Sequence, residues 1–251
     1  MAEVRANTDG HTTQPLALWS APRSRSTVFF RMMVERGEFT LAHEPFSELA
    51  AGRAARVADQ ELSDPATVID YMLREARPVF FKETTEYSHA SLFQAHPSIH
   101  AMTHTFIVRD PRRVINSHFA MNPEVTRDEI GFENLYEIFR IVQDQSGTIP
   151  VVIDADALVR DPAAVVSAYC ERVGLAARPT SLTWSPGARN EWASTSKWHE
   201  DVASSDTFRS DEREHAVTTD NDARLAEYLA YHLPFYQRLL DFSITTASRL
   251  P

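Results

Sequence analysis

The chain has 251 residues, of which 43% are hydrophobic and 24% are charged, as is ordinary for a globular protein with a substantial core. Its formal net charge of -10 argues against general binding of nucleic acids or anionic membranes as the main activity. The single cysteine, Cys170, excludes an intramolecular disulfide and a cysteine-based metal cluster, and it fits a reducing, cytoplasmic compartment. No apolar run in the sequence approaches the ~20 residues of a membrane-spanning helix.

Short apolar runs and helical segments alternate along most of the chain. Residues 1–14 are polar, and we predict a disordered tail there rather than a signal peptide. Residues 15–251 are expected to form a single α/β domain. Strands are predicted at residues 16–20, 39–42, 78–81, 103–108 and 149–153. Because most of these runs lack a regular polar alternation, we expect parallel strands with both faces buried.

Helix signals lie between the predicted strands. Three Asp-Pro pairs mark helix starts, because aspartate caps a helix and proline fits its first turn. Helices are predicted from about residues 26 to 34, 63 to 77, 110 to 121, 132 to 142, 161 to 174 and 220 to 240. Pro234 should kink or end the last of these helices. From about residue 180 the chain is rich in loops, and residues 184–213 resemble a loop or lid. The order of elements predicts a central parallel sheet flanked by helices in three layers.

Residues 22–27, Pro-Arg-Ser-Arg-Ser-Thr, connect the first predicted strand to the first helix. Such a turn lies at the carboxyl edge of a parallel sheet, where unpaired helix N–H groups favour an anion. Arg23 adds a bidentate cation, and Ser24, Ser26 and Thr27 add hydroxyl donors. The turn lacks the GxxxxGK[ST] pattern of nucleotide P-loops, which argues against an ATPase or GTPase. The alternative is that Ser26 only caps the helix and the arginines face solvent.

The same turn resembles the 5′-phosphosulfate loop, P-[KR]-S-G-[ST]-T, of sulfotransferases that use 3′-phosphoadenosine 5′-phosphosulfate (PAPS). Arg25 stands where the family often has glycine, and its side chain faces either the ligand or the solvent. Residues 109–117, Arg-Asp-Pro-Arg-Arg-Val-Ile-Asn-Ser, resemble the family's 3′-phosphate motif, R-D-P-R-x-x-x-x-S. The resemblance, which covers about residues 15–174, implies that residues 23–27 hold the phosphosulfate. It also implies that Arg109 and Ser117 hold the 3′-phosphate.

The resemblance implies in-line sulfuryl transfer from PAPS to a hydroxyl or amine of a small-molecule acceptor, without a metal. Arg23 and then Lys82 are the expected cations near the transferred group. Lys82 resembles the lysine of the K-[TS]-H motif, but Thr84 stands where that motif has its catalytic histidine. A base must therefore come from elsewhere. Glu44 is our prediction, because tyrosylprotein and some bacterial sulfotransferases place a glutamate base there. Glu83 is the second candidate, acting directly or paired with Lys82.

The C-terminal part offers further candidates. Residues 205–208 resemble the adenine-contacting T-x-F loop of the family, which implies cofactor-binding roles for Thr207 and Phe208. Arg209 or Arg213 could reach the 3′-phosphate from this loop. Residues that either line an acceptor pocket or anchor a lid are Trp192, Trp198 and His199.

Two other functions stay open from the sequence. A small-molecule kinase on a related fold would carry a P-loop Lys-Ser/Thr pair, which is missing here. The second alternative is a non-catalytic module that binds PAPS or 3′,5′-phosphoadenosine (PAP), because Thr84 replaces the catalytic histidine of the K-[TS]-H motif. We expect no nucleic-acid or membrane partner. The sequence specifies neither the acceptor nor an oligomeric state.

Overall fold

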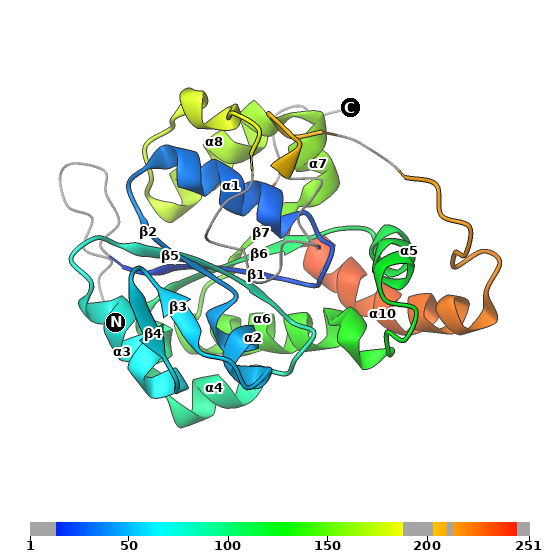
Figure 1. Ribbon diagram of the computed structural model, residues 1–251, viewed down its shortest axis with the longest axis horizontal. Coiled ribbons are helices and arrows are strands. Elements are labelled where there is room, and N and C mark those ends of the chain that lie inside the picture. The colour runs from blue at the N-terminus through cyan, green and yellow to red at the C-terminus, as the bar shows by residue number, and fades with distance from the viewer. Residues whose placement is uncertain (1–13, 188–202, 210–212, 245–251) are drawn as a thin grey trace.

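A five-stranded parallel sheet lies between two layers of helices in the computed structural model, which describes residues 14–187, 203–209 and 213–244 (Figure 1). The strand order is β2-β5-β1-β6-β7. The strands are β1 (Leu16–Ser20), β2 (Thr40–His43), β5 (Val79–Thr84), β6 (Thr103–Val108) and β7 (Val151–Asp154). The predicted central parallel sheet with flanking helices is confirmed. The tail predicted at residues 1–14 lies, apart from Gln14, outside the described residues.

Side chains of β1 alternate between two hydrophobic cores, because successive residues of a strand point to opposite faces. Ala17 and Trp19 belong to one core, and Leu16 and Leu18 belong to the other. The first core is covered by α3 (Pro65–Arg74), α6 (Phe132–Ser146) and α10 (Ala223–Leu240). The second is covered by α1 (Ser26–Arg36), α7 (Ala155–Arg160) and α8 (Pro162–Val173). Both faces of the sheet are therefore buried, as its continuous apolar runs predict.

The six predicted helices form, with small differences at their ends. The Asp-Pro starts are correct: Asp64, Asp110 and Asp161 each accept a backbone N–H bond at the head of α3, α5 (Pro111–Met121) and α8. The first of these helices ends at Arg74, not near residue 77, because Glu75 is already extended. Pro234 does not end α10, which continues to Leu240. Packing of α10 against α5 and α6 compensates for the backbone bond that the proline removes.

Several short elements were not predicted, because they are too short to show a period in the sequence. They are the hairpin β3 (Ala55–Val57) and β4 (Gln60–Leu62), the helices α2 (Pro45–Ala50) and α4 (Ala90–Ala95), the helix α7, and three 3-10 turns at Pro97–Ala101, Asp128–Ile130 and Pro179–Leu182. Of these, α2 bears on function, since it begins directly after Glu44. Within the described ranges, no helix combines the length and apolar character that a bilayer crossing requires.

The carboxyl ends of three neighbouring strands meet at one edge of the sheet. The last residue of β1, Ser20, is in register with Thr84 of β5 and Ile107 of β6. After β1 the chain continues into α1, which covers one face of the sheet. After β6 it continues into α5 and α6, and α6 covers the opposite face. This reversal is a topological switch point, and open α/β sheets bind ligands in the crevice there.

Candidate functional site

The turn from β1 to α1 holds two arginines in the left-handed backbone conformation. Arg23 has φ 62° and Arg25 has φ 65°, a region that costs a non-glycine residue about 1–2 kcal/mol. Arg25 is the N-cap of α1, so the family's frequent glycine at this place has a backbone reason. A hydrogen bond from Ser20 Oγ to Ser26 Oγ, 2.8 Å long, ties the helix start to the strand end. Surrounding contacts thus hold a strained turn in place.

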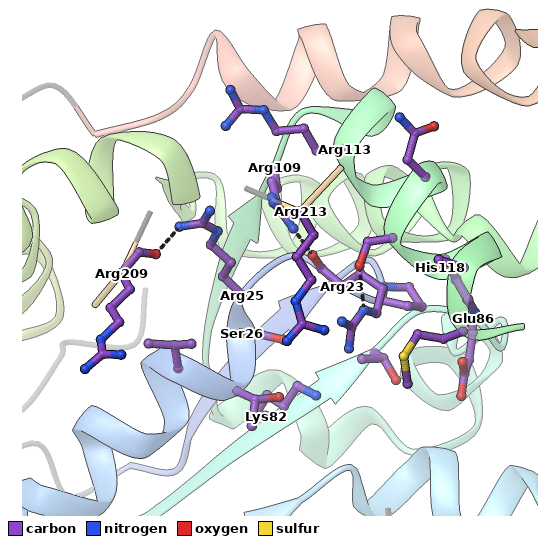
Figure 2. Close-up of a pocket in the computed structure, with 18 of the residues that line it drawn as sticks. Arg23, Arg25, Ser26, Lys82, Glu86, Arg109, Arg113, His118, Arg209 and Arg213 are labelled. Carbon is purple, nitrogen blue, oxygen red and sulfur yellow. Dashed lines mark hydrogen bonds between the residues drawn. The ribbon is translucent and has the colours of Figure 1, made fainter. Parts of the chain in front are cut away.

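The two segments with anion-binding motifs contact each other directly. Arg109 follows the last residue of β6, and Ser117 lies two turns into α5. Arg23 donates from Nε to Ser117 Oγ at 3.0 Å, and Arg109 donates from Nη1 to the Arg23 carbonyl at 3.1 Å (Figure 2). Residues from both ends of the predicted donor site therefore form one connected structure.

Arg109 carries the clearest mark of an anion site. Its Nε is buried and has no hydrogen-bond partner among the described residues. Burial and, after it, the nearby cations Arg25, Arg113 and Arg23 lower the pKa of its guanidinium to about 10. Nearby cations and an unpaired donor are both unfavourable unless a negative group binds there.

A cavity of about 870 Å³ lies against these residues. Its cationic lining consists of Arg23, Arg25, Arg53, Lys82, Arg109, Arg112, Arg113, Arg209 and Arg213. The carboxylates in its lining are Glu44, Glu86 and Glu214. Cations thus predominate here although the whole chain has a net charge of -10. Ser26 and Thr27 also line the cavity, whereas Ser24 is fully buried outside its lining with its Oγ unpaired among the described residues.

Residues 203–209 bring the C-terminal part of the chain to the cavity. Arg25 donates from Nη1 to the Arg209 carbonyl at 2.8 Å, so its side chain lies at the cavity rather than only in solvent. Thr207 lines the cavity, but Phe208 packs edge-on against Trp184, with ring centroids 5.5 Å apart, outside the lining. Three residues considered for the acceptor pocket lie outside the described residues: Trp192, Trp198 and His199.

Glu44 and Lys82 form an ion pair at the wall of the cavity. Lys82 lies on β5 and is in register with His43, the last residue of β2, so Glu44 comes next to it. The Glu44 amide donates to the Lys82 carbonyl at 2.8 Å, and the Lys82 ammonium donates to Glu44 Oε1. Glu44 has φ 52° directly before Pro45. This left-handed backbone is a local strain of the kind that accumulates at functional sites.

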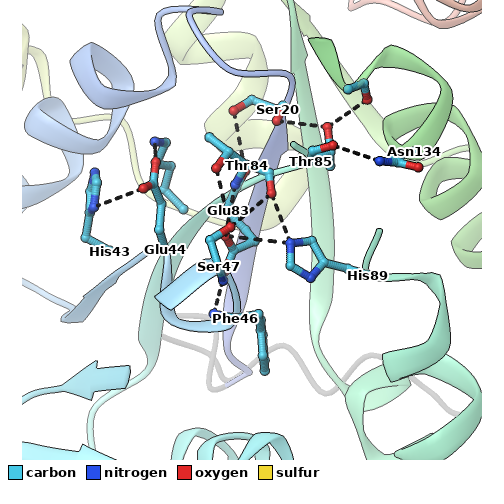
Figure 3. A network of polar contacts seen from close by, with 12 residues as sticks. Ser20, His43, Glu44, Phe46, Ser47, Glu83, Thr84, Thr85, His89 and Asn134 are labelled. Atoms are coloured by element: carbon cyan, nitrogen blue, oxygen red, sulfur yellow. Dashed lines mark hydrogen bonds and ion pairs between the residues drawn. The ribbon is translucent and has the colours of Figure 1, made fainter. Parts of the chain in front are cut away.

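Glu83 points to the other side of β5 and does not line the cavity. It is fully buried, and its carboxylate accepts bonds from the Phe46 amide at 2.7 Å and the Ser47 hydroxyl at 2.5 Å (Figure 3). Burial and, after it, the nearby Glu44 carboxylate together raise its pKa to about 8. The carboxyl group therefore fastens β5 to the start of α2, the helix that Glu44 precedes.

The structure adds cavity residues to which the sequence assigned no role: Glu86, Arg112, Arg113, His118 and His215. Glu86 could have been found by alternation, because Lys82, Thr84 and Glu86 are every second residue along β5 and beyond. Burial and the charge of Arg23 lower the pKa of His118 to about 4. The described residues contain no group of three or more His, Cys, Asp or Glu side chains placed to hold a metal ion.

Comparisons with known proteins identify the family. The family model of the sulfotransferase domain matches residues 15–241. Two curated proteins of Arabidopsis thaliana also match: branched-chain-amino-acid aminotransferase-like protein 2 is 26% identical over 206 residues, and protein 1 is 27% identical over 203 residues. These matches cover 78% and 76% of this chain but only 36% of each relative, so the chain spans about a third of their length.

Two solved structures resemble the fold. The sulfotransferase domain of the Synechococcus PCC 7002 olefin synthase has a TM-score of 0.47 and 14% identity, covering 87% of this chain and 94% of that one. The sulfotransferase domain from the curacin biosynthetic pathway has a TM-score of 0.46 and 13% identity, covering 92% and 99%. The family model extends over both segments that carry the predicted anion-binding motifs, the Glu44–Lys82 pair and residues 203–209. The chain therefore belongs to the sulfotransferase domain family.

Proposed function

We propose that this protein transfers the sulfuryl group of PAPS to a hydroxyl or amine of a small-molecule acceptor. One observation carries the proposal: the two motif segments contact each other beside a single cavity, and the Glu44–Lys82 pair lies in the wall of that cavity. The arrangement offers an anion site for a donor and a carboxylate for proton transfer within the same space.

The residues present fit the charge of PAPS. By the family resemblance, the turn of Arg23, Ser26 and Thr27 receives the phosphosulfate, while Arg109 and Ser117 receive the 3′-phosphate. The unpaired Nε of Arg109 supports this assignment, because a phosphate oxygen would supply its missing acceptor. Thr207, on the rim formed by residues 203–209, and Arg25, which donates to the Arg209 carbonyl, add further groups that can contact the donor.

In this reaction the chain would stabilise the departing oxygen, accept the proton of the acceptor and hold the base in position. The donor supplies the sulfuryl group, and the acceptor atom forms a new bond to sulfur as the bond from sulfur to the phosphate oxygen breaks. Arg23 and Lys82 stabilise the negative charge that grows on the departing oxygen. The Lys82 ammonium exchanges its ion pair with Glu44 for an interaction with the departing oxygen. The Glu44 carboxylate is then able to accept the proton of the acceptor. Glu83 keeps Glu44 in place through α2 and takes no proton from the acceptor.

The test measures transfer of labelled sulfate from PAPS to a panel of alcohols, phenols and amines. Replacing the base, Glu44→Gln, should reduce turnover by about 10²–10⁴-fold while PAP affinity stays the same. Glu48→Gln is the matched control, because Glu48 lies on α2 and, unlike its partner Arg53, does not line the cavity. Turnover retained in Glu44→Gln contradicts the base assignment.

Donor binding is tested separately by titration with PAP. Arg109→Ala should weaken PAP binding, whereas Arg140→Ala, at an exposed position on α6, should not. Unchanged affinity in Arg109→Ala contradicts the donor site. Tight PAP binding by the wild type without any transfer would instead favour the non-catalytic binding module.

A further inference from the structure

Glu86 is the one carboxylate of the cavity that the proposed mechanism does not use and that lies beside the Glu44–Lys82 pair. It comes two residues after the end of β5 and is partly buried in the cavity wall. Among the described residues, its side chain forms neither a hydrogen bond nor an ion pair. An ionised carboxylate that loses water without gaining a partner is destabilising, so a ligand group that pairs with Glu86 would be favoured.

Glu86 lines the same cavity as Lys82 and Thr84. Lys82, Thr84 and Glu86 line the cavity, whereas Glu83 and Thr85 are turned into the protein, so the alternation of β5 continues for the two residues after its end. These three cavity-lining residues therefore follow one another from Lys82, the proposed cation of the transfer step, through Thr84 to Glu86, which has no role in that step. Figure 2 shows Glu86 on the side of the cavity away from Arg25 and Arg209.

The cations near Glu86 are already engaged. Lys82 pairs with Glu44, and Arg53 pairs with Glu48 at 2.5 Å. Burial and then the nearby Glu44 charge raise the pKa of Glu86 to about 7, although the charges of Lys82 and Arg53 act to lower it. Among the described residues, the two cations that act on Glu86 therefore already have carboxylate partners, whereas several arginines line the cavity around Arg109.

We propose that Glu86 binds a cationic group of the acceptor, so that the substrate class is small hydroxylated molecules that also carry an ammonium group. This proposal rests on the proposed function for the identity of the reaction. The opposite charges on the two sides of the cavity give each ligand one orientation. The arginines attract the anionic donor and repel the ammonium group, and Glu86 does the reverse.

The experiment compares acceptors that differ only in charge. Labelled transfer from PAPS is measured with α,ω-amino alcohols of two to six carbons, with 1-alkanols and with ω-hydroxy carboxylates of the same lengths. For the best-fitting length, kcat/KM should be about tenfold or more higher for the amino alcohol than for the alkanol, as expected for a charge-assisted hydrogen bond. Equal values, or a preference for the alkanol or the carboxylate, overturn the proposal.

Two variants test whether the preference for the amino alcohol over the alkanol depends on the Glu86 side chain. Glu86→Gln should abolish the preference for the amino alcohol, mainly through KM. Glu129→Gln removes a nearby charge that also acts on Glu86 but does not line the cavity, so it should keep the preference. A preference that persists in Glu86→Gln, or one that Glu129→Gln removes equally, overturns the proposal.

A binding measurement separates this proposal from the reaction itself. Protein saturated with PAP is titrated calorimetrically with n-butylammonium and with n-butanol. Selective binding of n-butylammonium that disappears in Glu86→Gln supports the cation site even if no acceptor is sulfonated, a result that would contradict only the proposed function. Absence of this selectivity overturns the cation site even if transfer to other acceptors is observed.

Discussion

Arg23 donates from Nε to Ser117 Oγ at 3.0 Å, a contact between residues 94 positions apart in the sequence. The two belong to different predicted sites, one for the phosphosulfate and one for the 3′-phosphate. Their contact makes the position of the first cation depend on the second site. The two ends of the proposed donor site are consequently one structural unit.

Removal of the Ser117 hydroxyl should therefore weaken donor-site binding. We expect Ser117→Ala to lower PAP affinity by about 2–10-fold, the usual effect of one lost hydrogen bond. Ser117→Thr, which keeps the hydroxyl, is the matched control and should restore most of the affinity. Isothermal titration with PAP measures both. Equal affinities for wild type and Ser117→Ala would show that the contact does not contribute.

The left-handed backbone of Arg25 makes a second prediction. Arg25→Gly and Arg25→Ala both lose the bond to the Arg209 carbonyl, but only glycine adopts φ 65° without strain. Arg25→Gly should therefore unfold with a free energy about 1 kcal/mol higher than that of Arg25→Ala. Urea unfolding measures the difference. Equal stabilities would mean that the turn relaxes when its side chain is removed.

The raised pKa of Glu83 predicts a pH dependence of stability. The folded protein holds this proton up to about pH 8, whereas the unfolded chain releases it near the ordinary value of 4.5. The folded state thus binds more protons in between, and the Glu83 contribution to the unfolding free energy falls as pH rises from 4.5 to about 8.

Urea unfolding at several pH values tests this dependence. The decline in unfolding free energy between pH 5 and pH 8 should be smaller in Glu83→Gln than in the wild type. Glu61→Gln, at an exposed position of β4, should keep the wild-type slope. An identical slope in Glu83→Gln would contradict a protonated Glu83.

Gly131 should be sensitive to the smallest substitution. Its φ is 84°, and a Cβ added there would lie 2.7 Å from the Thr85 carbonyl oxygen. Thr85 also donates from Oγ1 to the Gly131 carbonyl at 2.8 Å, so the two backbones cannot separate freely. Gly131→Ala should lower the unfolding free energy by about 2 kcal/mol or more.

The matched control is Gly147→Ala, because Gly147 has φ 67° but nothing within 4 Å of an added Cβ. It carries the backbone strain without the clash, and its loss of stability should be clearly smaller. Equal losses in the two variants would show that the contact with Thr85 adds nothing.

Much of the fold could be predicted from local sequence. The strands are apolar because both faces of the sheet are buried, and the aspartates before three prolines cap helices as their chemistry dictates. Short elements such as α2 and the β3–β4 hairpin could not be predicted from local sequence, since their formation depends on tertiary contacts. The continuation of α10 past Pro234 has the same origin, because packing against α5 and α6 outweighs a local preference.

The site was predictable only in part. Motif spacing brought out Arg23, Arg109 and Ser117, because each lies at a fixed place after a strand. The direction in which a side chain points is harder to predict. Glu83 and Glu86 are the same residue type, yet one fastens α2 and the other lines the cavity, and the sequence alone does not show which face of the chain each occupies.

The Arg25 side chain holds the C-terminal segment by donating to the backbone carbonyl of Arg209, and this bond does not involve the Arg209 side chain. Every amino acid offers the same carbonyl, so this attachment places no demand on the residue type at position 209. Substitutions there can change the charge at the rim of the cavity while the segment stays fastened. The turn that begins α1 can thus keep its hydrogen bond to this segment whichever side chain stands at position 209.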